Sequence, residues 1–542
     1  MNNLQNKKTC TNAKTKHETG FDYVVSNMNI LTPFGKKALS EKKPFLPGEE
    51  NLLRAEYQRL GCILEFVKQE QKKADEIIEI LKEVKDMSFT IQRSAKDALS
   101  VVELFEVKSL LLKMDKISKF NLPKEYLLKD VTTLIKSLDP RNEGSETFYL
   151  YDEFSDVLRE IRERKRKAEA NLRKEQKELK DTIKQKYDIE LSQKFDITAS
   201  KANAQQLKVL KEIPELTQIS EDYISIVFSL KNTKEMDELL KELKRIAELI
   251  EAEELVVREK LSREIGSFAR DLLENCEKIG ELDIAIAKVV YANYANCTIP
   301  EISDDYIFEI TGGRHIPAYD AIIAKNKEYC PVSISLSKGV TCISGANMGG
   351  KTVTLKLVGL VALLAQHAFF VPCEKAIVGL SNYIQILIGD SQSLERGLSS
   401  FGGEVEELKE TLDSAKDRSL ILIDEIASGT NPSEGFALVK SLVDYLTGKP
   451  YISLLTTHFD GIASSENVNN LQVIGLANVD FDKLQGEIKH ADKSERVNII
   501  AAHMDYRLRN AKENDKVPKD ALNIAKMLGI NEEIIEAAKK YL

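Results

Sequence analysis

Apolar residues recur at every third or fourth position through the first half of the chain, as they do on helices that bury one face. This periodicity runs from Phe21 to about Ser137. It returns in a highly charged stretch from Val157 to Tyr187 and in a second repeat from Thr233 to Ala269. Two long helices separated by a shorter irregular stretch predict an antiparallel coiled-coil arm. A helical bundle packed on the body fits the same periodicity.

After Pro300 the pattern changes to short β-branched or apolar runs that alternate with helical segments. Four such runs lie at residues 332–336, 340–344, 420–423 and 452–456. Alternation of this kind predicts an α/β domain. The expected fold class is therefore an α-helical core/lever and coiled-coil clamp followed by an α/β domain.

Composition excludes several classes of protein. The 542 residues are 43% hydrophobic and carry a formal net charge of -9, which argues against non-specific nucleic-acid binding by the whole surface. The seven cysteines form no CxxC pair and have no metal-like spacing with histidine, as expected for reduced thiols in a cytoplasm. The polar start lacks the apolar core of a signal peptide, and no apolar run approaches the ~20 residues that span a bilayer. We expect a cytoplasmic protein with no membrane partner.

A phosphate-binding loop is the strongest chemical signal in the sequence. It follows the apolar run 340–344, opens an amphipathic helical segment, and reads Gly345-Ala346-Asn347-Met348-Gly349-Gly350-Lys351-Thr352. Glycines let backbone N–H groups approach phosphate oxygens, and a helix N-terminus favours negative charge there. Lys351 is expected to reach the β- and γ-phosphates of ATP, and Thr352 to coordinate Mg²⁺.

Two acids end the apolar run 420–423. Asp424 is placed to hold Mg²⁺, and Glu425 to orient and polarise the attacking water as general base. Thr456-Thr457-His458 ends the next apolar run, and this order along the chain predicts that His458 senses the γ-phosphate. Two further polar stretches, 398–404 and 428–432, contain Ser399, Ser400, Thr430 and Asn431. Alone, each would fit an ordinary loop followed by a helix cap.

This order of motifs resembles the MutS family of ABC-type ATPases, although Ala346 stands where the family usually has proline. The resemblance implies a P-loop ATPase domain, with Thr430 and Asn431 in the loop after the acidic strand. It also implies that Ser399 and Ser400 touch the γ-phosphate bound by the other subunit, so that the active ATPase is a homodimer with two composite sites. Gly313-Arg314-His315 is similar to the segment that opens this domain, but Ile316 intervenes before Pro317.

The resemblance implies a reduced MutS-like branch, without the mismatch-recognition domain and without the C-terminal Smr nuclease domain. The expected divisions are a disordered N-terminus (1–18), a helical core/lever (19–150), a coiled-coil clamp arm with its returning lever helix (151–275), a connector (276–300), the ATPase domain (301–505) and a C-terminal helical dimerisation segment (506–542).

Two partners of different classes remain open. One is double-stranded or branched DNA, because the segment from Arg159 to Lys186 has twelve Lys/Arg against six Asp/Glu, a local balance of +6. The other is a protein client, because the stretch after residue 503 is similar to MutS-like ATPase subunits of a reactivating factor for cobalamin- and PLP-dependent lysine 5,6-aminomutase. The acidic total charge weakens the DNA interpretation, whereas the basic helix favours it.

Overall fold

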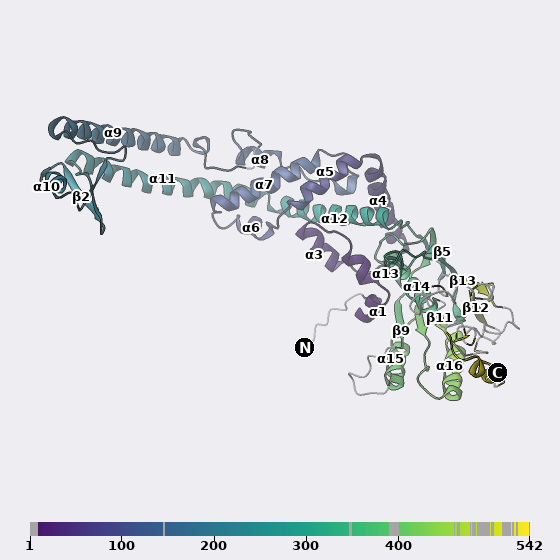
Figure 1. Cartoon of the computed structure of the whole chain (residues 1–542). Helices are drawn as coiled ribbons and strands as arrows, with labels where there is room; N and C mark the ends of the chain where they lie inside the picture. The colour runs from purple at the N-terminus through teal and green to yellow at the C-terminus, as the bar shows by residue number, and fades with distance from the viewer. Residues whose placement is uncertain are drawn as a thin grey trace, which may run out of the picture. The chain divides into compact units, whose positions relative to one another are not determined.

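The computed structural model (Figure 1) divides into two compact units. The body comprises residues 1–83, 121–127 and 277–542, and the arm unit comprises residues 84–120 and 128–276. The predicted segment 19–150 is therefore shared between both units. The structure describes residues 9–144, 147–345, 350–389, 400–459, 461–462, 467–476, 503–511 and 529–540, with residues 479, 484, 499, 522, 525 and 526.

Two long helices form most of the arm unit, α9 (Asp156–Tyr187) and α11 (Lys234–Ser267). They lie side by side in Figure 1 and run antiparallel, since Ser155 bonds to Glu253 while Arg164 pairs with Glu242. Leu158 and Ala168 of the expected seam are buried. The predicted pair of long helices is thus present, and each begins where a hydroxyl caps the first turn.

The stretch between these helices is not irregular, and that part of the prediction is wrong. It forms β1 (Asp196–Ser200), α10 (Ala204–Glu212), β2 (Leu216–Glu221) and β3 (Ser225–Leu230), in an antiparallel sheet of order β1-β3-β2. Alternate residues of β3, namely Ile226, Phe228 and Leu230, are buried against Leu210 and Ile183. This period-two alternation is the sequence signal for a half-buried strand.

Shorter helices complete the arm unit. They are α6 (Ser88–Arg93), α7 (Val101–Ser118), α8 (Thr132–Leu138) and the 3-10 turn η2 (Asp152–Phe154). A capping box between Ser100 and Glu103 starts α7. The buried ammonium of Lys108 on α7 lies 3.3 Å from Asp139 after α8. Helix α12 (Ala269–Tyr294) contributes residues to both units. Because it extends to Tyr294, most of the predicted connector 276–300 is helical.

A six-stranded sheet forms the centre of the body. Its order is β13-β12-β7-β11-β10-β9, and only β13 runs antiparallel to its neighbour. The strands are β7 (Gly339–Ser344), β9 (Tyr383–Ile388), β10 (Ser419–Asp424), β11 (Ile452–Thr456), β12 (Val468–Gly475) and β13 (Asp505–Asn510). The predicted boundary between residues 505 and 506 is wrong, because it would cut β13.

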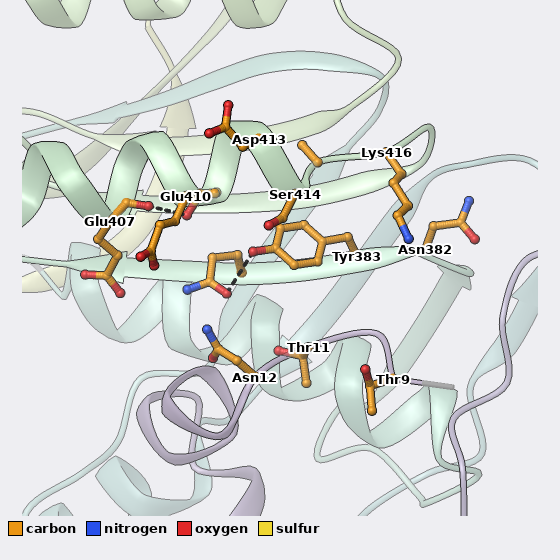
Figure 2. Close-up of a pocket in the computed structure, with 13 residues that line it drawn as sticks. Thr9, Thr11, Asn12, Asn382, Tyr383, Glu407, Glu410, Asp413, Ser414 and Lys416 are labelled. Carbon is orange, nitrogen blue, oxygen red and sulfur yellow. Dashed lines mark hydrogen bonds between the residues drawn. The ribbon is translucent and has the colours of Figure 1, made fainter. Parts of the chain in front are cut away.

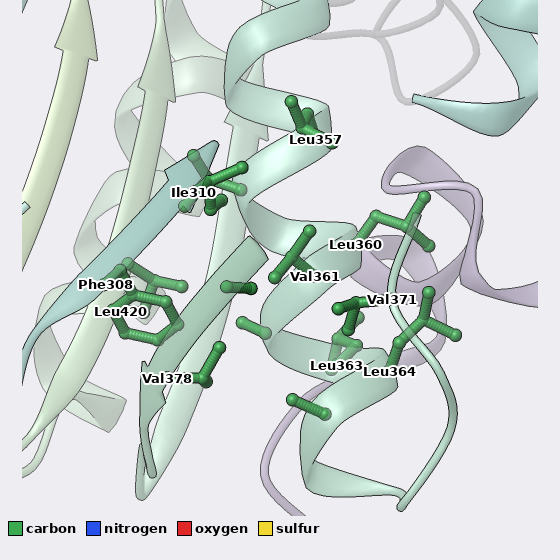
Figure 3. Packing of buried hydrophobic residues seen from close by; sticks show 14 of the residues in the cluster. Phe308, Ile310, Leu357, Leu360, Val361, Leu363, Leu364, Val371, Val378 and Leu420 are labelled. Atoms are coloured by element: carbon green, nitrogen blue, oxygen red, sulfur yellow. The ribbon is translucent and has the colours of Figure 1, made fainter. Parts of the chain in front are cut away.

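A second, four-stranded sheet has the order β4-β8-β5-β6, formed by β4 (Glu301–Ser303), β8 (Lys375–Gly379), β5 (Phe308–Gly313) and β6 (Val332–Leu336). Between the sheets, α14 (Lys351–Gln366) is apolar on nearly all sides, as expected for a fully buried helix. Figure 3 shows Val361 on the side of α14 that faces Phe308, Val378 and Leu420, and Leu360 and Leu364 on the opposite side.

Among the described residues, the other body helices are α1 (Ala13–Glu18), α2 (Phe21–Ser26), α3 (Pro33–Glu41), α4 (Glu50–Gln69), α5 (Gln71–Lys82), η1 (Lys124–Tyr126), α13 (Ile316–Ile323), α15 (Ser400–Ser414), α16 (Pro432–Thr447) and α20 (Glu532–Lys539). No helix in the described part of the chain is both long enough and apolar enough to cross a membrane.

Residues 9–18 are ordered and include α1, so the predicted disordered start is wrong for these residues. Cys10 accepts a hydrogen bond from the backbone N–H of Ile384 on β9 (2.7 Å), and Thr11 donates to the carbonyl of the same residue (2.8 Å). The segment therefore covers the outer edge of the sheet, and Figure 2 shows Thr11 and Asn12 beside this strand. Its polar side chains concealed this role, because a backbone carbonyl and a hydroxyl make these contacts and neither leaves an apolar pattern in the sequence.

Candidate functional site

Three adjacent parallel strands end at the same edge of the six-stranded sheet. In register, Asp424 at the end of β10 lies beside Thr456 of β11, and Thr456 lies beside Ile343 of β7. In open α/β sheets, ligands bind outside the carboxyl ends of such strands. The sheet therefore gathers the predicted site residues of three distant motifs at one edge.

The loop after β7 leads into α14 through two glycines with positive φ, Gly345 (136°) and Gly350 (75°). Gly350 is the N-cap of α14 in a left-handed conformation that favours glycine. The predicted phosphate contacts Ala346, Asn347, Met348 and Gly349 lie outside the described residues. Lys351 begins the helix, is buried, and donates from Nζ to the carbonyl of Gly345 (2.9 Å). Its position agrees with a lysine that follows a phosphate loop.

Asp424 is buried at the centre of the site and accepts two hydroxyl hydrogen bonds. Thr352 of α14 donates to Oδ2 (2.7 Å), and Thr456 of β11 donates to Oδ1 (2.6 Å). Carboxylate and hydroxyl oxygens are hard ligands of the kind Mg²⁺ prefers. Among the described residues there is no cluster of three or more His, Cys, Asp or Glu side chains that could hold a metal. A Mg²⁺ ion held by Asp424 and Thr352 would take phosphate oxygens and water as its other ligands.

Glu425 follows directly and turns away from the strand direction at a φ of 44°. Its backbone N–H donates to the carbonyl (3.2 Å) and to the hydroxyl (3.1 Å) of Thr456. Its Oε1 lies 2.8 Å from Nζ of Lys351, and 29% of its side chain is exposed. A left-handed glutamate costs about 1–2 kcal/mol, and the two bonds from its N–H oppose that cost.

The histidine motif lies at the same sheet edge. Thr457 donates its N–H to the carbonyl of Ile343 (3.2 Å), which joins this loop to β7. His458 is exposed, and its ring lies 4.3 Å from that of Phe459. A role for His458 as a γ-phosphate sensor remains a prediction.

The loop after Glu425 ends in a helix cap. Asn431 caps α16, accepting from the N–H of Ser433 (3.0 Å), and Pro432 occupies the first turn. A contact of Thr430 or Asn431 with ATP remains a prediction. Ser399 lies outside the described residues, and although Ser400 opens α15, its side chain also lies outside them.

Two positioning residues were missed by the sequence interpretation. Thr456 joins Asp424 and Glu425, and the only signal for it was its place in the Thr456-Thr457-His458 motif. Glu404 of α15 accepts from the N–H of Ala427 (3.0 Å), which has a φ of 63°. Because Glu404 is the last residue of the stretch 398–404, this bond connects that stretch to the loop beyond the acidic strand.

The C-terminal part of the chain matches known proteins. Residues 341–542 match the family model for MutS domain V. A protein named Endonuclease MutS2 from Clostridium botulinum (strain ATCC 19397 / Type A) is 35% identical over 245 residues, which are 42% of this chain and 30% of the relative. These matches support membership of the MutS family.

Two further MutS2-named relatives are similar to the chain. The Clostridium tetani protein is 32% identical over 292 residues (52% of this chain, 33% of the relative), and the Fusobacterium nucleatum protein is 33% identical over 275 residues (50% and 32%). The chain thus spans about a third of the length of these curated MutS relatives. The match places MutS domain V over the six-stranded sheet from β7 onward.

Proposed function

We propose that the protein binds and hydrolyses ATP at the edge formed by β7, β10 and β11. The observation that carries this proposal is the hydrogen-bonded group in which Thr352 and Thr456 both donate to Asp424. A lysine at the start of α14 and a second acid lie directly beside that group. This arrangement supplies a cation for phosphate, oxygens for a metal ion and a carboxylate for water.

Each residue has a separate role in the proposed reaction. Lys351 neutralises the β- and γ-phosphates, and the backbone at Gly345 and Gly350 allows their close approach. Thr352 and Asp424 hold Mg²⁺, which neutralises charge on the phosphates when it is bound. Glu425 orients the attacking water and accepts its proton. His458 contacts the γ-phosphate and so reports its presence.

The active form is proposed to be a homodimer in which Ser399 and Ser400 of each subunit complete the site of the other. ATP binding would then close the dimer, and hydrolysis would open it. All seven cysteines are free thiols, which supports a cytoplasmic location.

Double-stranded or branched DNA is the first candidate for the molecule held by α9 and α11. Eight of the twelve basic residues between Arg159 and Lys186 form ion pairs with acids. Three others, Lys167, Arg173 and Lys177, are exposed, and within residues 147–345 no ion pair involves them. These three residues are the proposed phosphate contacts, and the name of the relatives, an endonuclease, supports a nucleic-acid partner.

A protein client is the second candidate, favoured by the hairpin between β2 and β3. Tyr223 is fully exposed at its turn, the adjacent Ile224 is 74% exposed, and Ile219 on β2 of the same hairpin is 58% exposed. An exposed apolar patch of this kind is typical of protein–protein contacts. A lysine 5,6-aminomutase complex that ATP hydrolysis reactivates is the proposed client in this case.

Calorimetry on a Lys351→Ala variant tests the central proposal. Removal of the main counter-charge for phosphate is expected to abolish measurable ATP binding, whereas Lys356→Ala, one turn further along α14, is expected to retain it. Tight ATP binding by Lys351→Ala would remove the phosphate role from this lysine. A Glu425→Gln variant that retains its client can then be captured from the native host, and the retained DNA or protein identifies that client.

A further inference from the structure

A second charged cavity lies in the body, away from the sheet edge that carries the proposed ATP site. It has a volume of about 770 Å³ and is lined by the N-terminal segment, the residues around the end of α3, and His367 after α14. Small-molecule sites occupy cavities of about 300–1,000 Å³. All of these lining residues belong to the body.

The lining is strongly basic. Lys16, Lys42 and Lys43 line it, and the single carboxylate among the lining residues is that of the exposed Glu41. Lys42 is paired with Glu56 (2.8 Å), whereas no ion pair involves Lys16 or Lys43 within residues 9–144 and 147–345. Among the described residues, these two ammonium groups therefore have no carboxylate partner, and that of Lys16 lies 5.5 Å from the centroid of the Phe21 ring.

Hydroxyl groups and one buried imidazole add directional contacts. Thr11 and Ser40 line the cavity beside the lysines. The buried ring of His367 donates from Nδ1 to the carbonyl of Leu363 (2.8 Å), which leaves Nε2 as the acceptor of the neutral ring. Burial, together with the charges of Lys16, Lys288 and Lys42, lowers the pKa of His367 to about 4.

The carbonyl groups at the end of α14 do not oppose negative charge in this cavity. Those of residues 367 and 368 accept from the buried Nζ of Lys288 (3.5 and 2.7 Å), and that of residue 365 accepts from Tyr57 (3.1 Å). The carbonyl of Gln366 accepts from the N–H of Phe45 (2.7 Å). Each of these carbonyls already has a donor, and the lysines are the charged groups of the lining that favour an anion.

A neighbouring cavity of about 490 Å³ has the opposite charge. Thr9 and Thr11 line both cavities, and the second is also lined by three acids of α15, Glu407, Glu410 and Asp413, against one lysine, Lys416 (Figure 2). The N-terminal segment thus separates a basic cavity from an acidic one. The basic cavity is therefore expected to favour an anionic ligand, and the acidic cavity a cationic one.

We propose that the basic cavity binds a small phosphate-bearing molecule. Lys16 and Lys43 supply the counter-charge, and Ser40 and Thr11 donate hydroxyl hydrogen bonds to phosphate oxygens. The site lies at the end of α14 opposite Lys351, and its ligand joins the N-terminal segment to the chain after α3. Occupancy therefore fixes the segment that covers the edge of β9.

Titration calorimetry of the full chain with inorganic pyrophosphate tests this site. All proteins carry Lys351→Ala, so that the phosphate loop does not contribute. In that background the parent is expected to bind pyrophosphate, and Lys16→Gln/Lys43→Gln is expected to bind it at least about tenfold more weakly. Lys43→Gln alone changes an exposed side chain and is expected to give part of that loss with an unchanged unfolding temperature.

The matched control is Lys14→Gln/Lys37→Gln. It removes the same charge from the same region, but Lys14 pairs with Glu407 and neither lysine lines the cavity. Its affinity is expected to stay within about twofold of the parent. Absence of pyrophosphate binding by the parent would overturn the proposal. An equal loss in the control pair and the cavity pair would overturn it as well, because binding would then follow overall charge.

Discussion

Nζ of Lys351 lies 2.8 Å from Oε1 of Glu425, so the proposed phosphate-binding cation and the proposed general base neutralise each other. Lys351 also donates to the carbonyl of Gly345 (2.9 Å). Phosphates that bind Lys351 compete with this carboxylate for the ammonium and can displace it. Displacement would free Glu425 to bind water, so nucleotide binding and activation of the base are coupled through one ion pair.

Glu425→Gln is therefore expected to have two opposite effects. ATP binding should tighten about two- to fivefold, because a neutral amide competes less for Lys351 and the pair is only partly buried. Turnover should fall about 10²–10⁴-fold through loss of the general base. Calorimetry and steady-state phosphate release measure these effects, and Glu434→Gln on α16 is the control. Unchanged turnover would remove Glu425 from catalysis.

Thr456→Val tests the group that holds Asp424. The substitution keeps the shape of the side chain but removes the donor to Oδ1 (2.6 Å) and one acceptor for the N–H of Glu425. Half-maximal turnover should then require about tenfold more Mg²⁺, since loss of a buried hydrogen bond costs about 1–3 kcal/mol. Thr447→Val, at the end of α16, should leave the Mg²⁺ dependence unchanged. The same Mg²⁺ dependence in both variants would contradict the positioning role of Thr456.

The strands around the site were predictable from the sequence to within one residue. The apolar runs 332–336 and 452–456 coincide with β6 and β11, and the runs 340–344 and 420–423 fall inside β7 and β10. Central parallel strands are buried on both faces and so read as continuous apolar runs. The pairing of Lys351 with Glu425 could not be predicted, because it depends on how α14 meets β10 in space. The small sheet between α9 and α11 was missed because β2 exposes five of its six residues and β1 buries only Ala199.

The composite-site proposal predicts complementation between two inactive proteins. Ser399→Ala/Ser400→Ala should bind ATP but hydrolyse it poorly, because it lacks the groups that reach the partner's γ-phosphate. Mixed with Lys351→Ala, it should recover part of the activity, since one of the two sites in a mixed dimer is then intact. Phosphate release is measured after mixed dimers have been verified by differential tagging. If such dimers form without any recovery, the serines do not act in trans.

Two buried histidines predict a loss of stability in mild acid. Burial lowers the pKa of His315 and of His367 to about 4, below the ordinary value of 6.5. The unfolded chain therefore binds more protons between pH 6.5 and 4, and the free energy of unfolding should fall as pH decreases through that window. His315→Gln retains a donor for the carbonyl of Thr19, which His315 Nε2 contacts at 3.1 Å, and should reduce the slope. Urea unfolding at pH 7 and pH 5 measures the free energy of unfolding at each pH. Between these two values the variant should lose about 1–3 kcal/mol less than the parent. An identical slope in the variant would show that His315 does not contribute.

The DNA proposal makes a prediction about the outer face of α9. Lys167, Arg173 and Lys177 are exposed, whereas Arg162 is held by Asp152 (2.7 Å) and Glu254 (2.8 Å), so only the former three can be neutralised without loss of arm packing. Changing the three to Gln should weaken binding to branched or duplex DNA similarly across sequences. The slope of log K against log salt should become less steep by up to about 0.9 for each phosphate that the variant no longer neutralises.

The matched control changes three exposed basic residues of α11 to Gln, namely Lys241, Lys244 and Arg245. This helix has seven Lys/Arg against ten Asp/Glu. An equal effect of both triple variants would mean attraction by overall charge. Absence of salt-dependent DNA binding by the unmodified protein would end the DNA proposal and leave the protein client, which the exposed hairpin at Tyr223 would then be expected to contact.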